Sequence, residues 1–494
     1  MRISVPNRDR IKYRLVEHHL FTHFERHILF NVKTMLFYEV TPLVRDLILR
    51  LSDHPEDHIK SRLAGRFSKR EIQHALDHLE KEHFLEDATP ARESNCLLKK
   101  RKGLRHLELM VTHGCNMRCL YCYGDRSDGR HGEQRLLYGS GEAGMSLETA
   151  LKGIDFLFRE SGRRKEVSVI FFGGEPLLEM GLLERIVPYV REKEMQTGKK
   201  ADISLSTNGL LLKDGNLEFL VKNRISCQVS LDGPGEIHDR NRLLPDGSGS
   251  YERVMDGVRR LIARRGGKVP VRATIAHGRI DLPAIVEHLL SLGFGSVHAE
   301  PAIGGNSATS ITPGDLDEIK KQIDTLALFL VRSVRENRFF NFTNLVRQIR
   351  QTRVVRERLA HYCGAGRTYL AMARDGGFYP CHRFVGMEEY RMGDIDTGPD
   401  WTLRNRILDL TVDNRAVCRE CWARYLCGGG CWKHAVDRSG CLERPDEELS
   451  CRITRHYIEC AMAINSELRV SDQDILSRLY EESTEPYLIT GKGD

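Results

Sequence analysis

Three cysteines lie close together in the stretch HGCNMRCLYCYG, which runs from His113 to Gly124. Cys115, Cys119 and Cys122 are spaced C-x3-C-x2-C. A closed metal site normally takes four ligands, so three thiolates leave one coordination position open. They can hold three irons of a cubane iron–sulfur cluster and leave the fourth iron able to bind a substrate. The alternative is a zinc site completed by a remote ligand such as His113.

A second set of cysteines follows nearer the C-terminus, again with short regular spacing. The chain has 14 cysteines and no export signal, so ligation of iron–sulfur clusters or zinc is a better interpretation than disulfides. Cys96, Cys227 and Cys460 have no assigned role, and Cys227 is expected in the core because it lies in a predicted strand. The cysteines of the second set are Cys363, Cys381, Cys418, Cys421, Cys427, Cys431, Cys441 and Cys451.

The composition is that of a soluble globular protein with more than one domain. The chain has 494 residues, of which 40% are hydrophobic and 29% charged. No apolar run is long enough to span a membrane, and the N-terminal stretch lacks the apolar core of an export signal. We therefore expect a cytoplasmic protein with no membrane partner. The net charge of +6 suits an acidic peptide but gives no argument for nucleic acid.

Alternating strand and helix patterns between about residues 104 and 310 must position the first cysteine loop. Six apolar runs, each typical of a parallel strand buried on both faces, alternate with helical stretches such as 146–162. Six such units predict an α/β fold, a partial (β/α)6 barrel of the TIM type, with a doubly wound open sheet as the alternative. The predicted strands are 107–112, 167–172, 202–206, 226–231, 270–275 and 296–301.

Polar or glycine-rich turns follow the first four predicted strands. The cysteine loop follows the first, GGEP (173–176) the second and STNG (206–209) the third. DGP (232–234) follows the fourth, directly after Ser230 and Leu231. Because the carboxyl ends of barrel strands form one face, these turns are predicted to meet at one rim. STNG and DGP are alternatively turns without a chemical role.

These motifs resemble those of the radical S-adenosylmethionine enzymes, whose defining motif is C-x3-C-x2-C after the first strand. The resemblance covers about 104–310, includes GGEP, and implies a [4Fe–4S] cluster on Cys115, Cys119 and Cys122. In that family the open iron binds the amino and carboxylate groups of S-adenosylmethionine (SAM). Reductive cleavage of SAM then gives a 5′-deoxyadenosyl radical, which removes a hydrogen atom from the substrate.

The resemblance also implies which residues contact SAM. Glu175 matches the acidic contact to the amino group, and Gly173 and Gly174 would let the backbone approach it. Ser230 and Arg242 match positions that hold the carboxylate, for which a guanidinium is suited. The other cofactor-binding candidates are Tyr121 near adenine, Pro176 of the same motif, and Ser206, Thr207 and Asn208 near ribose or substrate.

The second cysteine set resembles the SPASM extension of these enzymes, which binds two auxiliary [4Fe–4S] clusters, so three clusters are expected in all. The resemblance assigns one cluster to Cys418, Cys421, Cys427 and Cys451, and the other to Cys363, Cys381 and Cys431. Cys441 could replace Cys451 in the first cluster. The fourth ligand of the second cluster could be Cys441, another side chain or a substrate thiol. A pair of zinc knuckles is the alternative.

One departure from the family concerns the residue after the YPC motif. Sulfatase-maturing members carry Asp there, whereas this chain has His382. The change weakens the interpretation that the enzyme makes formylglycine. An imidazole can nevertheless act as a base near neutral pH, so His382 is a candidate catalytic residue.

Residues 1–88 resemble the winged-helix element with which peptide-modifying enzymes bind a leader peptide. A hairpin is predicted over 27–40, with its edge open to β-augmentation, followed by helices from Thr41, Pro55 and Ser68. Ser68 and Glu71 predict a capping box. A packing or oligomerisation unit is the alternative. The remaining predicted parts are a linker (89–103), the barrel (104–312), a helical connection (313–360), the SPASM domain (361–460) and a C-terminal tail (461–494).

Together the resemblances imply a maturase that joins a cysteine sulfur to a carbon of another residue. The implied partners are a Cys-containing precursor peptide or small protein subunit, bound by the N-terminal domain, and a low-potential electron donor of the flavodoxin or ferredoxin type. The long loop 123–146 is expected to line the peptide channel. The alternatives are carbon–carbon cross-linking, epimerisation, formylglycine formation, or a non-catalytic iron–sulfur protein that binds a peptide.

Overall fold

The computed structural model describes residues 13–51, 62–63, 65–87, 103–126, 135–136, 144–304, 308–355, 357–468, 472 and 474. Its central feature is an eight-stranded sheet in the order β15-β14-β12-β11-β10-β6-β16-β17. The six predicted strands are all present. They are β6 (His106–Thr112), β10 (Glu166–Gly173), β11 (Lys200–Thr207), β12 (Ser226–Ser230), β14 (Pro270–Ile275) and β15 (Ser296–Pro301).

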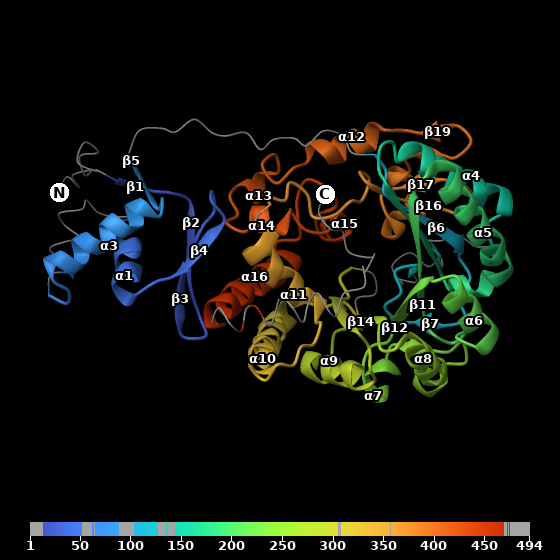
Figure 1. The fold of residues 1–494 in the computed structure, drawn as a ribbon, viewed down its shortest axis with the longest axis horizontal. Coiled ribbons are helices and arrows are strands. Elements are labelled where there is room, and N and C mark those ends of the chain that lie inside the picture. Colours follow the sequence, from blue (N-terminus) through green and yellow to red (C-terminus); the bar gives the residue numbers. More distant parts are fainter. Residues whose placement is uncertain are drawn as a thin grey trace.

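These six strands are parallel and lie side by side in their order along the chain. A doubly wound sheet would reverse its strand order near the middle, so the topology is that of a barrel. Because β15 and β6 do not pair, the barrel is partial, as predicted. Helices alternate with the strands at the right of Figure 1. They include α4 (Leu147–Glu160), α5 (Met180–Thr197), α6 (Asp214–Lys222), α8 (Tyr251–Arg265) and α9 (Leu282–Ser291).

The sheet is extended by two strands that the sequence did not predict. β16 (Tyr369–Met372) pairs in parallel with β6, and β17 (Phe378–Tyr379) pairs antiparallel with β16. Both strands come from the cysteine-rich segment. Leu370 and Met372 join the same apolar core as Leu107 and Leu109 of β6. The cysteine-rich segment therefore folds directly onto the barrel.

Helices of the C-terminal half fill the space between the barrel and the N-terminal unit in Figure 1. The longest are α10 (Leu316–Arg335) and α16 (Ser450–Glu467), with α11 (Thr343–Arg350) beside them. The predicted boundary between 460 and 461 lies inside α16, whose residues are buried on both sides of that point. No described helix is long and apolar enough to cross a membrane. The shorter helices are α7 (Gly235–His238), α12 (Thr402–Asp409), α13 (Ala416–Arg419), α14 (Arg424–Cys427) and α15 (Trp432–Ser439).

The N-terminal unit contains the predicted hairpin and two of its three predicted helices. The hairpin comprises β3 (Arg26–Asn31) and β4 (Leu36–Glu39), and β2 (His18–His23) pairs with the other side of β3. Among the described strands, β4 is therefore the one strand of the predicted hairpin that has an unpaired edge. Two short strands, β1 (Tyr13–Leu15) and β5 (Leu85–Asp87), pair separately.

The two described helices of this unit are α1 (Pro42–Leu51) and α3 (Lys69–Lys81). The capping box of Ser68 and Glu71 is confirmed at the start of α3. Most of the helix predicted from Pro55, and the linker apart from its last residue, lie outside the described residues.

Candidate active site

The first cysteine loop lies at the carboxyl end of β6 and is held by a segment that follows β12 in the chain. β7 (Arg118–Cys119) pairs with β13 (Arg242–Leu243), which places Cys119 opposite Arg242. The backbone NH of Leu120 donates to the carbonyl of Asn241 at 2.9 Å. The loop is therefore anchored to β6, which directly precedes it, and to β13, which comes much later in the chain.

The thiols of this loop are close enough to interact electrostatically with one another. Burial raises the pKa of Cys115 to about 11 and that of Cys119 to about 12. Buried thiols of this kind stay protonated unless a metal displaces the proton, so a cationic centre suits Cys115, Cys119 and Cys122. Burial and nearby Arg374 lower the pKa of His113 to about 4, and Asp375 is its other main charged neighbour. His113 thus lies near the turn between β16 and β17.

The two glycines of GGEP allow β10 to approach this loop closely. A Cβ on Gly173 would lie 2.0 Å from the carbonyl oxygen of Thr112, and one on Gly174 would lie 2.0 Å from that of Gly114. The NH of Gly174 donates to Thr112 at 3.0 Å, and that of Glu175 donates to Gly114 at 2.9 Å. Besides the role toward SAM that the resemblance implies, these glycines let the cysteine loop pack on GGEP.

Glu175 is completely buried at the end of β10. Its Oε1 accepts from the NH of Leu177 at 3.1 Å and from Oγ1 of Thr207 at 2.8 Å, and its Oε2 accepts from the NH of Asn208 at 2.7 Å. Burial raises the pKa of Glu175 to about 7, although these bonds favour the charged form. A carboxylate can accept about four hydrogen bonds, so one acceptor position remains for a cationic ligand. Pro176 follows as the first residue of a short 3-10 helix.

The DGP turn supplies a buried acid that links several parts of the site. Arg242 Nε lies 3.1 Å from Oδ1 of Asp232, and the hydroxyl of Tyr121 donates to the other oxygen of this carboxylate. The Arg242 guanidinium lies 5.6 Å from the centre of the Tyr121 ring. The NH of Thr274 donates to Asp232 at 2.9 Å. Two of the predicted SAM-binding residues, Tyr121 and Arg242, therefore meet around Asp232.

The STNG turn touches the first cysteine of the loop. Nδ2 of Asn208 lies 3.8 Å from Sγ of Cys115 and donates to Oδ1 of Asn116 at 2.7 Å. Ser206 Oγ lies 3.5 Å from Oε1 of Gln228, one strand away. Ser230 ends β12, in register with Arg272 of β14. The ends of the first four strands thus form one constellation, in which Asn208 and Asp232 are partners of the cysteine loop.

The second cysteine set falls into two groups in space. Cys451, at the start of α16, interacts electrostatically with Cys418, Cys421 and Cys427, and we call these the four-cysteine group. Cys381 interacts with Cys363 and Cys431, and these form the three-cysteine group. Burial raises the pKa of both Cys363 and Cys418 to about 11. Both groups therefore have the closely placed, buried thiols that suit metal ligation.

Cys441 follows α15 in the chain and has polar neighbours. Its Sγ is 3.8 Å from Oγ of Ser439, and it interacts electrostatically with Tyr390 and Glu443. Arg383 approaches the three-cysteine group, with Nη1 3.7 Å from Sγ of Cys431. A guanidinium placed there stabilises negative charge on the thiolate.

His382 joins the three-cysteine group to the interior of the barrel. Its Nδ1 lies 2.8 Å from Oε2 of Glu108, a buried carboxylate on β6, and the hydroxyl of Tyr369 donates to the same carboxylate oxygen. The imidazole stacks on Phe172 with ring centres 4.5 Å apart. Sequence reasoning missed Glu108 and Tyr369. A glutamate inside the apolar run LELMVT was the only signal available.

With this geometry established, comparisons with known proteins identify the class. Residues 109–289 match the profile of the radical SAM superfamily. An uncharacterised protein of Archaeoglobus fulgidus is 29% identical over 351 residues, covering 69% of this chain and 77% of that protein. The serine-type anaerobic sulfatase-maturating enzyme of Bacteroides thetaiotaomicron is 25% identical over 363 residues, covering 66% and 81%. The solved structure of native anSMEcpe with bound AdoMet has a TM-score of 0.59 at 21% identity, covering 74% and 99%.

The chain is therefore a radical SAM enzyme, and residues 109–289 are its radical SAM domain. Membership of this superfamily implies one [4Fe–4S] cluster and SAM. The three thiols at the end of β6 and the donor and acceptor groups around them fit these ligands.

We predict that Gly174→Ala will disrupt the cysteine loop, because the added methyl group would collide with the carbonyl of Gly114. The iron content of anaerobically reconstituted enzyme should fall by about one cluster. Gly181→Ala in α5 is the matched control, since a Cβ there meets no atom within 4 Å. Equal iron in both variants would show that the contact does not position the loop.

Proposed function

We propose that this enzyme forms thioether cross-links in a ribosomally made peptide or a small protein subunit, joining a cysteine sulfur to a carbon of another residue. The observation that carries the proposal is the pairing of His382 with Glu108. It sets a base and its orienting acid between the barrel interior and the three-cysteine group. A thioether requires both a hydrogen acceptor for carbon and a proton acceptor for sulfur, and this arrangement provides the second.

The residues proposed to bind the cofactors are those that the sequence motifs indicate, and the contacts described above support their roles. Cys115, Cys119 and Cys122 would hold the SAM-binding cluster, and the two other cysteine groups would hold auxiliary [4Fe–4S] clusters. Glu175 would accept from the amino group of SAM, while Ser230 and Arg242 would contact its carboxylate. When bound, SAM and the clusters supply the radical that takes a hydrogen atom from carbon and an acceptor for the electron left when sulfur bonds to carbon.

His382 is the group that would receive the thiol proton. The Glu108 carboxylate lies beside Nδ1 of His382 and orients the ring. Because a hydrogen on Nδ1 would donate to this carboxylate, Nε2 is the atom left to accept the thiol proton. The atoms balance: the peptide loses one hydrogen atom from carbon, one proton from sulfur and one electron per link. The mass therefore falls by two hydrogens for each thioether.

A peptide partner is supported by the names of similar proteins. Relatives include cysteine-type and serine-type sulfatase-maturating enzymes, and the chain also resembles, with a TM-score of 0.58, anSMEcpe bound to AdoMet and the Cp18Cys peptide. We propose that a leader segment adds as a strand to the open edge of β4. Residues 1–88 would then be the recognition domain. A flavodoxin or ferredoxin would supply electrons.

The first experiment is the intact mass of a Cys-containing precursor peptide encoded beside this gene, after anaerobic co-expression. With the wild-type enzyme we expect a loss of two hydrogens for each cysteine that resists alkylation. The triple variant Cys115/Cys119/Cys122→Ala should leave mass and thiols unchanged. A loss of two hydrogens with all thiols free would instead support carbon–carbon linkage, and an unchanged mass with inverted stereochemistry would support epimerisation.

Glu175→Gln should weaken SAM binding at least about tenfold, which corresponds to about 1.4 kcal/mol. The amide loses the negative charge, and its NH2 group would face one of the donors that Glu175 accepts from, namely Leu177, Thr207 and Asn208. Equilibrium binding of labelled SAM to cluster-loaded enzyme measures the effect. Glu184→Gln, on the exposed face of α5, is the matched control. Wild-type affinity in Glu175→Gln would contradict the assigned role.

His382→Gln should separate SAM cleavage from product formation. The variant keeps a polar side chain but cannot take a proton, so 5′-deoxyadenosine should still form while cross-linked peptide per 5′-deoxyadenosine falls about 100-fold or more. Glu108→Gln should lower the same ratio by a smaller factor, because an amide oxygen holds the His382 ring less strongly than a carboxylate does. Equal losses of 5′-deoxyadenosine and product in His382→Gln would assign the residue to SAM binding instead.

A further inference from the structure

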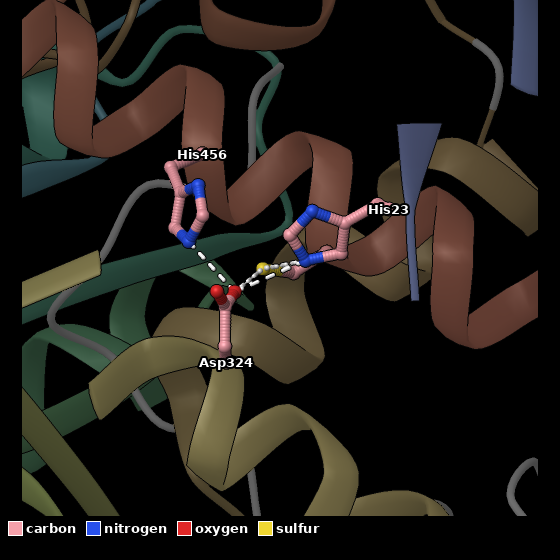
Figure 2. A group of neighbouring side chains, drawn as sticks. His23, Asp324 and His456 are labelled. Atoms are coloured by element: carbon pink, nitrogen blue, oxygen red, sulfur yellow. Dashed lines mark hydrogen bonds and ion pairs between the residues drawn. The ribbon is translucent and has the colours of Figure 1, made fainter. Parts of the chain in front are cut away.

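A further cluster of possible metal ligands contains none of the cysteines assigned to the groups described so far. It comprises His23, the last residue of β2, Asp324 of α10, and His456 and Cys460 of α16. Each side chain offers one ligand atom, and these atoms all lie within 4.8 Å of one another. Figure 2 shows the two imidazoles approaching Asp324 from two sides. His23 and Cys460 are 437 residues apart in the sequence, so only the fold brings the set together.

The distances between the ligand atoms suit a four-coordinate metal. Nε2 of His23 and Nε2 of His456 lie 3.0 Å and 2.8 Å from Oδ1 of Asp324. Sγ of Cys460 lies 3.4 Å from Nε2 of His23 and 3.3 Å from Oδ1 of Asp324. In a tetrahedral zinc site, with bonds of about 2.0 Å to N and O and about 2.3 Å to S, ligand atoms lie about 3.3–3.6 Å apart. Small side-chain adjustments would therefore admit the ion.

The chemistry of the four donors points to zinc. One thiolate, one carboxylate and two neutral imidazoles balance the charge of a divalent cation, so the filled site carries no net charge. The mixture of sulfur, nitrogen and oxygen donors fits Zn²⁺ and does not fit Mg²⁺ or Ca²⁺, which prefer oxygen. His456 and Cys460 are four residues apart on one helix and so share a face. Cys460 is completely buried, whereas the Asp324 side chain is 34% exposed and gives the ion a way in.

We propose that His23, Asp324, His456 and Cys460 bind one Zn²⁺ that fastens the N-terminal sheet to the C-terminal helices. On binding, a Zn–S bond replaces the S–H bond of Cys460 and the proton passes to solvent. Four protein ligands close the site, so its role is structural. The proposal does not depend on which peptide reaction the enzyme performs.

The cluster lies in an interface between the N-terminal sheet and the later turns of α16. Nε2 of His19 lies 2.8 Å from Oε1 of Glu459, and Nε of Arg26 donates to Glu467 at 2.7 Å. Apolar residues of β3 pack beside them against Ile458 and Met462. The proposed ion lies within this contact. It would set the position of the β2–β3–β4 sheet relative to the catalytic body.

The test is zinc analysis of the full-length, cluster-loaded enzyme after dialysis. We expect one zinc per chain by elemental analysis, and X-ray absorption at the zinc edge should show one sulfur and three nitrogen or oxygen scatterers. This measurement needs no variant. Absence of zinc would overturn the proposal and leave a hydrogen-bonded network. Zinc surrounded by sulfur alone would place it in a cluster site, which would also overturn the proposal.

Variants locate the ion. Cys460→Ala should lose the zinc, whereas Cys227→Ala, which truncates another buried cysteine outside every group, should retain it. Asp324→Asn is a second variant at a part-exposed position, and it should bind zinc at least tenfold more weakly. Hydrogen exchange in β2 and β3 should rise in Cys460→Ala and not in Cys227→Ala. Zinc retained in both Cys460→Ala and Asp324→Asn, or a mononuclear iron signal that Cys460→Ala abolishes, would overturn the zinc assignment.

Discussion

The buried ion pair of Asp232 and Arg242 is the interaction on which the candidate site depends. Both side chains are almost inaccessible, at 1% and 9% exposure, so neither charge could be buried without the other. Arg242 lies opposite Cys119, and Tyr121 donates to Asp232 from the same loop. The pair thereby fastens a loop that follows β6 to the end of β12, across the mouth of the barrel.

The other strand ends reinforce this arrangement from the opposite side. Glu175 collects donors from Thr207 and Asn208, and Asn208 in turn reaches Cys115. These bonds join the ends of β10 and β11 to the first cysteine. A thiol set can hold a metal only if its ligands are fixed before the ion arrives, because ordering a flexible loop would oppose binding. Here the contacts come from the ends of β10, β11 and β12, so the rigidity of the sheet is passed to the loop.

Much of the barrel and of the candidate site could be predicted from the sequence because their signals are local. Parallel strands buried on both faces appear as apolar runs, and the motifs follow them directly. The strands and the face where their carboxyl ends meet could therefore be predicted together. The capping box at Ser68 was equally local. β16 was missed because a four-residue strand in a cysteine-rich segment has too little pattern to detect. Glu108 and Tyr369, the partners of His382, were missed because their pairing depends on how β16 and the following turn lie against β6.

The cluster around Asp324 also depends on tertiary packing, and the sequence gives no signal that its members meet. His456 and Cys460 have helical spacing, but that spacing is common, and nothing local connects them with His23. Their meeting depends on α16, which carries Cys451 of the four-cysteine group in its first turn and ends at Glu467, where Arg26 and Arg335 both bind. One continuous helix thus carries an auxiliary cysteine near its start and contacts the N-terminal sheet through its later turns. Because a helix transmits position with little bending over 18 residues, it fixes where the open edge of β4 lies relative to those cysteines.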